Sequence, residues 1–387
     1  MSESATVSAR GAERWARGHP WIFRSDVRRP PDAPAGAVRV RDERGRWHGV
    51  ALWSPVSEIS LRLLDRAPDV TIGPAWWRTR LQAAIARRDP IRGESTAYRL
   101  VHGEGDGLPS LVCDRYDRWL VVQLLSAGLE TFREEIVDAL AGLTGAEGIL
   151  ARNDAAVRSR EGLARETVLL RGTVPDEVIV EEAGVRFQAA PWTGQKTGAF
   201  LDQRANRVLM GRLARGTALD CFCYHGSFAL HLARGADRVM AIDSSAEALQ
   251  RAEANALLNG LGNIELVEAN VFDDLRDRDR AGERYDTIVL DPPAFAKSRD
   301  SLDAALRGYH EINLRAMKLL APGGVLFTAS CSYHVTRPLF LEMVRAAAQD
   351  SGRHLVVREV VGQPPDHPEV VTIPETGYLK GVILQAG

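Results

Sequence analysis

The sequence has 387 residues, 45% of them hydrophobic and 26% charged, so it can bury a large core and exceeds one ordinary domain. No run of about 18 apolar residues occurs, and the first ten residues are polar, which argues against a membrane span and a signal peptide. The four cysteines form no CxxC pair and have no histidine at zinc-ligand spacing, so we expect a reduced cytoplasmic protein without disulfides or a metal site.

Charge is distributed unevenly along the chain. The first 100 residues carry 18 arginines against 11 acidic residues, a balance of +7, so the net charge of -2 leaves -9 for the remaining 287 residues. Guanidinium groups bind phosphate through paired hydrogen bonds, which favours an anionic partner for this part of the chain. An ordinary solvated surface is an equally good interpretation of the arginines alone.

Residues 1–72 are predicted to form a small β-rich module. Short apolar segments alternate there with turns rich in proline, glycine and aspartate, a pattern typical of strands in an antiparallel sheet. The expected strands are Val38 to Arg41, Trp47 to Trp53 and Ile59 to Leu64.

Residues 73–190 mix helical and strand patterns, which predicts a central α+β domain. The expected elements are helices at Trp76 to Arg88 and Thr131 to Ala141, and strands at Trp119 to Leu125 and Gly184 to Ala189.

Residues 191–387 alternate short apolar strands with helices, which predicts a parallel sheet covered on both faces. Pro322-Gly323-Gly324 is expected to end the long helix Leu302 to Leu320 and to turn the chain into the next strand. The expected strands are Ala218 to Phe222, Arg238 to Ile242, Ile264 to Glu268, Thr287 to Leu290, Val325 to Ala329 and Tyr378 to Gln385.

The ends of the first three of these strands predict a nucleoside site, because ligands bind at the carboxyl ends of parallel strands. Gly226 allows a tight turn before a helix, and Asp243, 23 residues after Asp220, is placed to accept hydrogen bonds from ribose hydroxyls. A glycine in such a turn is also common for steric reasons alone, but GxGxxG is absent, which disfavours a dinucleotide. We expect Asp220 and Tyr224 to face the amino-acid part of an adenosyl ligand. Asn270 and the amide of Val271 would face adenine.

The fourth strand leads into Asp291-Pro292-Pro293-Ala294-Phe295. Two prolines remove two backbone donors and stiffen the loop. Such a loop suits the binding of a flipped base, with the carboxyl group on the ring edge and the aromatic ring on its face. A rigid strand-to-helix turn would explain the prolines but not the pairing of the carboxylate with an aromatic ring.

The fifth strand ends in Ser330-Cys331-Ser332, which places a thiol at the same edge. Carbon 5 of cytosine is a poor nucleophile, so its methylation needs a thiolate that first adds at carbon 6. A lone cysteine on an apolar strand is often a small core residue, but here it follows the apolar run and lies in a polar turn. Cys331 is therefore the predicted nucleophile.

At these residues the chain resembles the bacterial 23S ribosomal RNA 5-methylcytosine methyltransferases that carry an N-terminal PUA domain. The resemblance covers nearly the whole sequence and rests on a set of motifs. These are Gly18 to Phe23, Gly105 to Pro109, Gly194 to Gly198, Phe200 to Arg204, Asp291 to Ser298, Ser330 to His334, Asp366 to Pro368 and Tyr378 to Lys380.

The resemblance implies an α/β protein with an N-terminal PUA domain, a central α+β domain and a C-terminal Rossmann-like class I methyltransferase domain. It implies S-adenosylmethionine as cofactor, 23S ribosomal RNA as partner and Cys331 as the nucleophile, with Asp291 beside it. Lys196 and Arg204 would bind substrate together with Pro292, Pro293 and Phe295. The family usually has an aspartate where this chain has Asn270, so the contact with the adenine amino group is expected to be weaker.

Three other interpretations stay open at this point. The enzyme could methylate a nitrogen of guanine or adenine, for which Cys331 is unnecessary; the chain could be a non-catalytic RNA-binding factor; or it could be a nicotinamide dehydrogenase, which the missing GxGxxG disfavours. The sequence also leaves open the modified nucleotide, the base that removes the carbon 5 proton, and whether the chain forms a homodimer.

Overall fold

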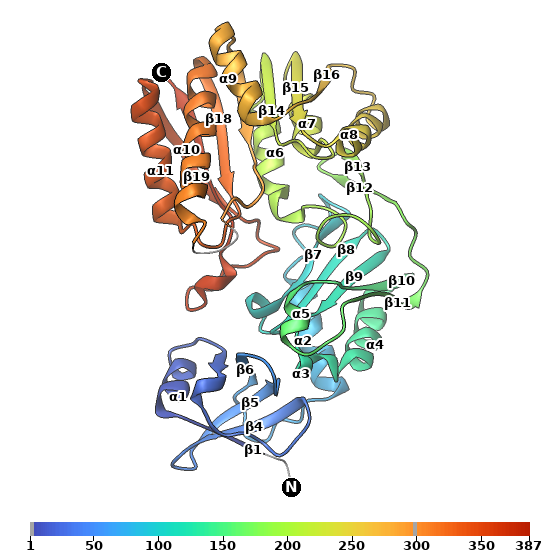
Figure 1. The fold of residues 1–387 in the computed structure, drawn as a ribbon. Helices are drawn as coiled ribbons and strands as arrows, with labels where there is room; N and C mark the ends of the chain where they lie inside the picture. The colour runs from blue at the N-terminus through green and yellow to red at the C-terminus, as the bar shows by residue number, and fades with distance from the viewer. Residues whose placement is uncertain (1–3, 297–299) are drawn as a thin grey trace. The chain divides into compact units, whose positions relative to one another are not determined.

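The computed structural model describes residues 4–296 and 300–387, which form two compact units (Figure 1). Each unit is assembled from separate stretches of chain, so its boundaries do not follow sequence order. The boundaries near residues 72 and 190 therefore stay a prediction. The first unit comprises Met1–Val180, Ala189–Leu201 and Pro365–Gly377, and the second comprises Glu181–Gln188, Asp202–Pro364 and Tyr378–Gly387.

The N-terminal part of the first unit is a six-stranded sheet in the order β2-β6-β5-β4-β1-β3. Alternate residues of β4 are buried, so Val38 and Val40 enter a core that includes Trp15 and Leu61, while Arg39 and Arg41 face solvent. The predicted strands are confirmed. The elements are β1 (Ser4–Val7), α1 (Ala9–Ala16), β2 (Trp21–Phe23), β3 (Val27–Arg29), β4 (Gly36–Asp42), β5 (Trp47–Trp53) and β6 (Ile59–Asp65).

The central part of the first unit is a five-stranded sheet in the order β11-β10-β9-β8-β7, with helices packed over its apolar residues. The two predicted helices and the strand from Trp119 are confirmed, with ends shifted by a few residues. The elements are α2 (Pro74–Ala86), β7 (Ala97–His102), β8 (Leu111–Tyr116), β9 (Trp119–Leu124), α3 (Ala127–Glu130), α4 (Arg133–Thr144), β10 (Gly148–Asn153), α5 (Val157–Arg160) and β11 (Glu166–Gly172).

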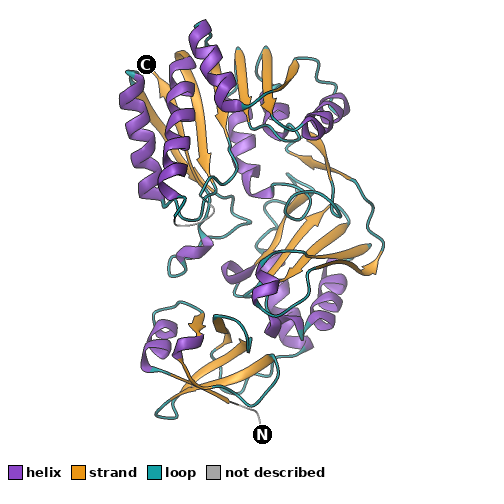
Figure 2. Cartoon of the chain, in the orientation of Figure 1, coloured by secondary structure: helices purple, strands orange, loops and turns teal. Residues whose placement is uncertain are grey.

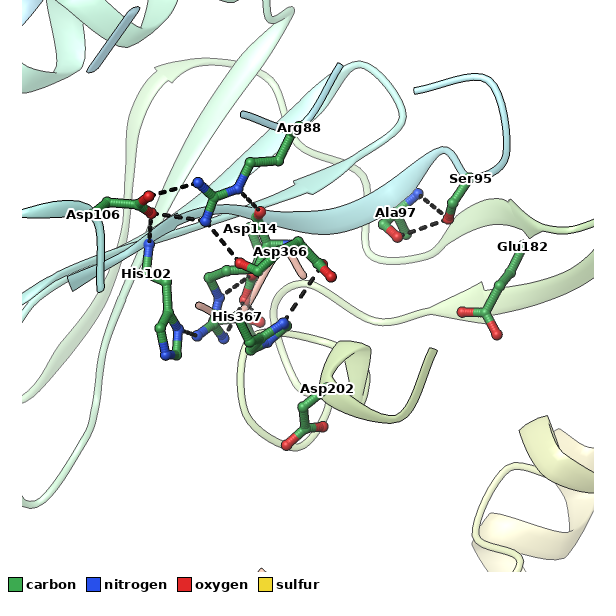
Figure 3. Close-up of polar contacts among 12 residues, drawn as sticks. Arg88, Ser95, Ala97, His102, Asp106, Asp114, Glu182, Asp202, Asp366 and His367 are labelled. Atoms are coloured by element: carbon green, nitrogen blue, oxygen red, sulfur yellow. Dashed lines mark hydrogen bonds and ion pairs between the residues drawn. The ribbon is translucent and has the colours of Figure 1, made fainter. Parts of the chain in front are cut away.

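A buried ion network holds the C-terminal segment Pro365–Gly377 to the first unit (Figure 3). The guanidinium of Arg88 donates to both carboxylate oxygens of Asp106 at 2.7 Å and to the carbonyl of Asp366 at 2.7 Å. The Asp366 carboxylate in turn accepts from the backbone amide of Arg99 at 3.0 Å. Because Arg88, Asp106 and Asp366 are buried together, their hydrogen bonds fix the segment although it lies far away in sequence.

The second unit is built on a seven-stranded sheet in the order β16-β15-β14-β17-β18-β20-β19, in which β20 runs antiparallel to both of its neighbours, β18 and β19, and the other pairs are parallel. Helices cover both faces, and α10 and α11 lie side by side on one of them (Figures 1 and 2). The elements are β12 (Val178–Glu182), β13 (Val185–Ala189), α6 (Arg204–Leu213), β14 (Thr217–Cys221), α7 (Ser227–Leu232), β15 (Arg238–Asp243), α8 (Ala246–Leu258), β16 (Ile264–Glu268), α9 (Val271–Ala281), β17 (Tyr285–Leu290), α10 (Leu302–Leu319), β18 (Leu320–Ser330), α11 (Arg337–Ser351), β19 (Leu355–Gly362) and β20 (Lys380–Ala386).

The predicted alternation of strands and helices is confirmed, with one local difference. Residues Pro322 to Gly324 were expected as a turn, but β18 begins at Leu320 and bulges there. Tyr285 pairs with Leu320 and Thr287 with Val325, so four residues of β18 are accommodated opposite one of β17.

The described part of the chain contains no helix that is long and apolar enough to cross a membrane.

Candidate active site

Strand order reverses at β14, because the chain runs outward through β15 and β16 and then returns to β17 on the other side of β14. In open parallel sheets, ligands bind at the carboxyl edge beside this point. Asp220 lies near the end of β14 and Asp243 at the end of β15. Asp291 directly follows β17 and Cys331 directly follows β18. The structure therefore brings these four predicted residues to one edge of the sheet.

The turn between β14 and α7 has an unusual backbone. Phe222, Tyr224 and Gly226 all lie in the left-handed region, with φ of 64°, 50° and 81°. A non-glycine residue there is strained, and such strain concentrates at functional sites. A side chain on Gly226 would approach Cβ of Ala252 to 3.0 Å, so this position also needs the absence of a Cβ for close packing on α8.

Asp220 is a fully buried carboxylate of which only one oxygen is hydrogen-bonded within the described residues. Its Oδ2 accepts a hydrogen bond of 2.8 Å from the amide of Ala229, whereas Oδ1 has no hydrogen-bond partner among the described residues. Burial, together with the charges of Asp291 and Asp243, raises the pKa of Asp220 well above its usual value. Asp220, Asp243 and Asp291 lie close enough for their charges to interact, so together they favour a positively charged ligand.

Asp243 is oriented by backbone amides. Its Oδ2 accepts from Tyr224 at 2.9 Å and its Oδ1 from Ser245 at 3.0 Å. Each carboxylate oxygen has a second lone pair, so the residue can still accept hydrogen bonds from two ribose hydroxyls.

Asn270 caps α9. Its side-chain oxygen accepts from the amide of Phe272 at 2.9 Å, directly beside buried Val271. The oxygen that was expected to face adenine therefore already accepts one hydrogen bond, and the amide nitrogen can only donate.

A polar chain from α6 holds Asp291. Nε2 of Gln203 donates to Asp291 Oδ1 at 2.6 Å, and Asn206 donates to Oε1 of Gln203 at 2.6 Å. Pro292 is buried and Pro293 is exposed. Asp291 thus has a fixed orientation at the end of β17.

Phe295 lies in an aromatic cluster. Its ring centroid is 4.6 Å from that of Tyr309, 5.7 Å from that of Phe272 and 6.2 Å from that of Phe222. Its partly buried ring therefore borders the side of the site formed by α9, and its predicted stacking on a base stays a prediction. Ser298, the last residue of the motif that begins at Asp291, lies outside the described residues.

Cys331 lies in a well-braced turn and is half-buried, whereas the other three cysteines, Cys113, Cys221 and Cys223, are buried. The hydroxyl of Ser332 accepts from the amide of Ala296 at 3.1 Å, which ties this turn to the loop that follows β17. The same hydroxyl shares a hydrogen bond of 2.9 Å with Tyr309.

The two remaining predicted residues lie in different units. Arg204 is buried at the start of α6 in the second unit. Lys196 belongs to the first unit, where its ammonium lies 4.6 Å from the ring centroid of Phe200. Its predicted contact with substrate stays a prediction.

This geometry defines a Rossmann-like fold with a cluster of carboxylates at its switch point. Residues 98–384 match the family model described as S-adenosylmethionine-dependent methyltransferase, and residues 5–66 match that of a PUA-like domain. The chain therefore belongs to the S-adenosylmethionine-dependent methyltransferase family, and its cofactor is S-adenosylmethionine. The carboxylates of Asp220, Asp243 and Asp291 fit this cofactor, which carries an ammonium and a sulfonium group.

Relatives at higher identity resemble the chain over nearly its full length. A Tolumonas auensis protein named Ribosomal RNA large subunit methyltransferase I is 43% identical over 380 residues, which cover 96% of each chain. The protein of the same name from Aeromonas salmonicida is 41% identical, again over 96% of each chain.

Two solved structures share the fold over 99% of both chains. One is an S-adenosylmethionine-dependent methyltransferase from Streptococcus mutans, with a TM-score of 0.82 and 21% identity. The other is a methyltransferase in complex with SAH, with a TM-score of 0.84 and 21% identity.

Sequence reasoning overlooked Gln203, Ser332 and Lys380 as parts of the site. All three residues belong to motifs singled out in the sequence, so those motifs were the available signal. Their partners could not be read from spacing, because Gln203 and Asp291 are 88 residues apart and Lys380 and Ser332 are 48 apart.

Proposed function

We propose that this enzyme transfers a methyl group from S-adenosylmethionine to carbon 5 of a cytosine in 23S ribosomal RNA, through a covalent bond to Cys331. The observation that carries the proposal is the half-buried thiol of Cys331 at the carboxyl edge of the sheet, in a turn that is hydrogen-bonded to the loop following Asp291. Neither cofactor binding nor methylation of a ring nitrogen requires a thiol there. The names of the relatives support a ribosomal RNA substrate.

Each group at the carboxyl edge has a separate role in the proposed reaction. The thiolate of Cys331 adds to carbon 6 of cytosine, and the displaced electron pair makes carbon 5 nucleophilic. The bound cofactor supplies an electrophilic methyl group. Asp291, held by Gln203, accepts a hydrogen bond from the base and orients its ring. After methylation, loss of the carbon 5 proton restores the double bond and expels the Cys331 thiolate.

The PUA-like sheet offers a surface for RNA phosphates. Arg29 is paired with Thr6, Thr6 with Arg41, and Arg41 with Trp47, so these residues form one row across four neighbouring strands. Arg29 and Arg41 are exposed, and the Arg41 guanidinium lies 5.8 Å from the Trp47 ring centroid. Exposed guanidinium groups beside an aromatic ring are suited to a phosphate backbone with accessible bases.

The covalent step can be tested with one variant. Cys331→Ala should lose essentially all turnover but keep its affinity for cofactor and RNA, because only the covalent intermediate is removed. Ribosomal RNA with 5-fluorocytosine should trap the wild-type enzyme covalently, since fluorine replaces the proton that must leave, and the variant should form no adduct. Cys113→Ala, a change at a buried cysteine of the first unit, is the matched control and should be trapped like the wild type.

Mapping 5-methylcytosine in ribosomal RNA from cells with and without the gene identifies the product. Substantial methylation by Cys331→Ala, with the methyl group on a ring or exocyclic nitrogen, would exclude the carbon 5 mechanism. A wild-type protein that binds RNA but not S-adenosylmethionine would instead point to a non-catalytic RNA-binding role.

A further inference from the structure

Lys380 is a buried cation beside the proposed nucleophile. It is only 4% exposed, and it is paired with Ser330 across β18 and β20, one residue before Cys331. Its Nζ donates to the carbonyl of Ser332 at 2.7 Å and to the carbonyl of Tyr378 at 2.8 Å. Within residues 4–296 and 300–387 it has no carboxylate partner. A buried lysine without an opposite charge is costly, so a fold that keeps one needs a reason.

The surroundings of Lys380 lower its pKa but leave it an ammonium at pH 7. Burial lowers the pKa of Lys380 to about 8; the charge of Cys331 opposes this shift, and that of Arg337 adds to it. Arg337 lies close to the strand position next to Lys380. Gly362 of β19 is paired with Lys380, and a Cβ built on Gly362 would lie 3.7 Å from Nη2 of Arg337.

Two further titratable groups face this cluster. The Tyr309 hydroxyl bonds to Ser332, and burial raises the pKa of Tyr309, with Cys331 adding to the rise. Asp202 accepts from the hydroxyl of Tyr378 at 2.9 Å. The charge of Cys331 therefore raises the pKa of both Lys380 and Tyr309.

We propose that the ammonium of Lys380 stabilises the thiolate of Cys331 by its charge, so that the thiol gives up its proton to solvent more readily and the sulfur is ready for attack on carbon 6. The proton of the S–H bond passes to water, and the electron pair of that bond stays on sulfur. The carbonyls of Ser332 and Tyr378 accept two of the three ammonium protons, which holds the charge at the turn that contains Cys331. Lys380 acts through Cys331 and is a positioning residue for the proposed function, on which this inference rests.

A thiol at its ordinary pKa of about 8.5 is mostly protonated at pH 7, so the proposed reaction would otherwise begin from a small fraction of the enzyme. An ammonium beside a thiol favours the thiolate over the thiol, so the proposed contact enlarges that fraction. After carbon 6 is released, the same ammonium receives the thiolate again.

The test measures alkylation of Cys331 by iodoacetamide across pH, read by mass spectrometry on the full chain without RNA or cofactor. The other cysteines are buried, so the reaction reports Cys331. In the wild type the midpoint should lie below about 8.5. In Lys380→Met, which keeps the length of an apolar stem, it should rise by about one pH unit or more, which is roughly tenfold slower alkylation near pH 7. Lys380→Arg should restore the low midpoint, because it keeps the charge.

Lys318→Met, the same change at the end of α10, is the control and should leave the midpoint unchanged. A wild-type midpoint at or above about 8.5 overturns the inference without any variant, even if Lys380→Met fails to fold. An unchanged midpoint in a folded Lys380→Met also overturns it. The 5-fluorocytosine adduct separates the two proposals, since an adduct with Cys331 and an unchanged midpoint would reject the role of Lys380 alone.

Discussion

A buried ion cluster in the second unit predicts how far one substitution lowers the stability of that unit. Glu182 accepts from Nε of Arg207 at 2.7 Å, from Nη2 of Arg207 at 2.6 Å and from Nε2 of His231 at 3.0 Å. These side chains are at most 4% exposed. The cluster connects β12 with α6 and α7, so it joins the segment Glu181–Gln188 to the remainder of the unit.

Glu182→Gln keeps the size of the side chain but removes its charge. The buried Arg207 guanidinium then loses the carboxylate that accepts two of its hydrogen bonds, and the loss of one partner of a buried pair costs about 3–5 kcal/mol. Single domains are stable by only about 5–15 kcal/mol, so the second unit should lose a large part of its free energy of unfolding.

The same cluster predicts a pH dependence. Burial by itself would raise the pKa of Glu182, but Arg207 and His231 lower it to about 2 from the usual 4.5. The folded pKa is the lower one, so the stabilisation is complete above pH 4.5 and is lost as the pH falls towards about 2. In Glu182→Gln this acid-dependent loss should be smaller.

Two spectroscopic signals separate the units during urea unfolding. Tryptophan fluorescence follows the first unit, which contains all eight tryptophans, whereas far-UV circular dichroism follows both. Glu182→Gln should lower the midpoint seen by circular dichroism, while Glu181→Gln, a change at the exposed neighbour, should alter it little. A circular dichroism midpoint equal to that of the wild type would refute the energetic argument. The tryptophans are Trp15, Trp21, Trp47, Trp53, Trp76, Trp77, Trp119 and Trp192.

Three further predictions concern the ligands. Asp243→Ala should weaken S-adenosylmethionine binding by about 1.5–3 kcal/mol, or roughly 10- to 150-fold by calorimetry, and unchanged affinity would place the ribose contact elsewhere. Asn270→Asp should tighten it by about 0.5–1.5 kcal/mol, because a second oxygen becomes free for the adenine amino group; weaker binding would contradict that contact. Removing two charges with Arg29→Gln and Arg41→Gln should lower the salt slope of RNA binding by about 1.5, whereas the same change at exposed Arg171 should not; equal slopes would exclude the PUA-like sheet as the phosphate surface.

Much of the fold could be predicted from the sequence, because local periodicity reports which side of each element is buried. The strands that end at Asp243 and before Asp291 are short apolar runs between helical stretches, which is sufficient to expect a parallel sheet. Since carboxyl ends of parallel strands share one edge, the same patterns also place Asp220 and Cys331 at that edge.

The backbone of the cofactor turn was less accessible to prediction. Phe222 was expected to end the first strand, but β14 ends at Cys221 and Phe222 is left-handed. Likewise, the sequence predicts that Asn270 contacts adenine, which stays a prediction, but it does not show that the side-chain oxygen also caps α9. Both outcomes depend on hydrogen bonds that a residue pattern does not specify.

By itself, the sequence therefore determined the alternation of elements and the chemical groups at the strand ends. Only the tertiary structure decided which distant groups meet: Arg88 with Asp366, 278 residues away, and Lys380 with the Cys331 turn. It also decided that Pro365–Gly377 belongs to the first unit. The physical reason is that periodicity reports burial over a few residues, whereas these pairings depend on strand register and on the burial of charges that are satisfied only in the folded chain.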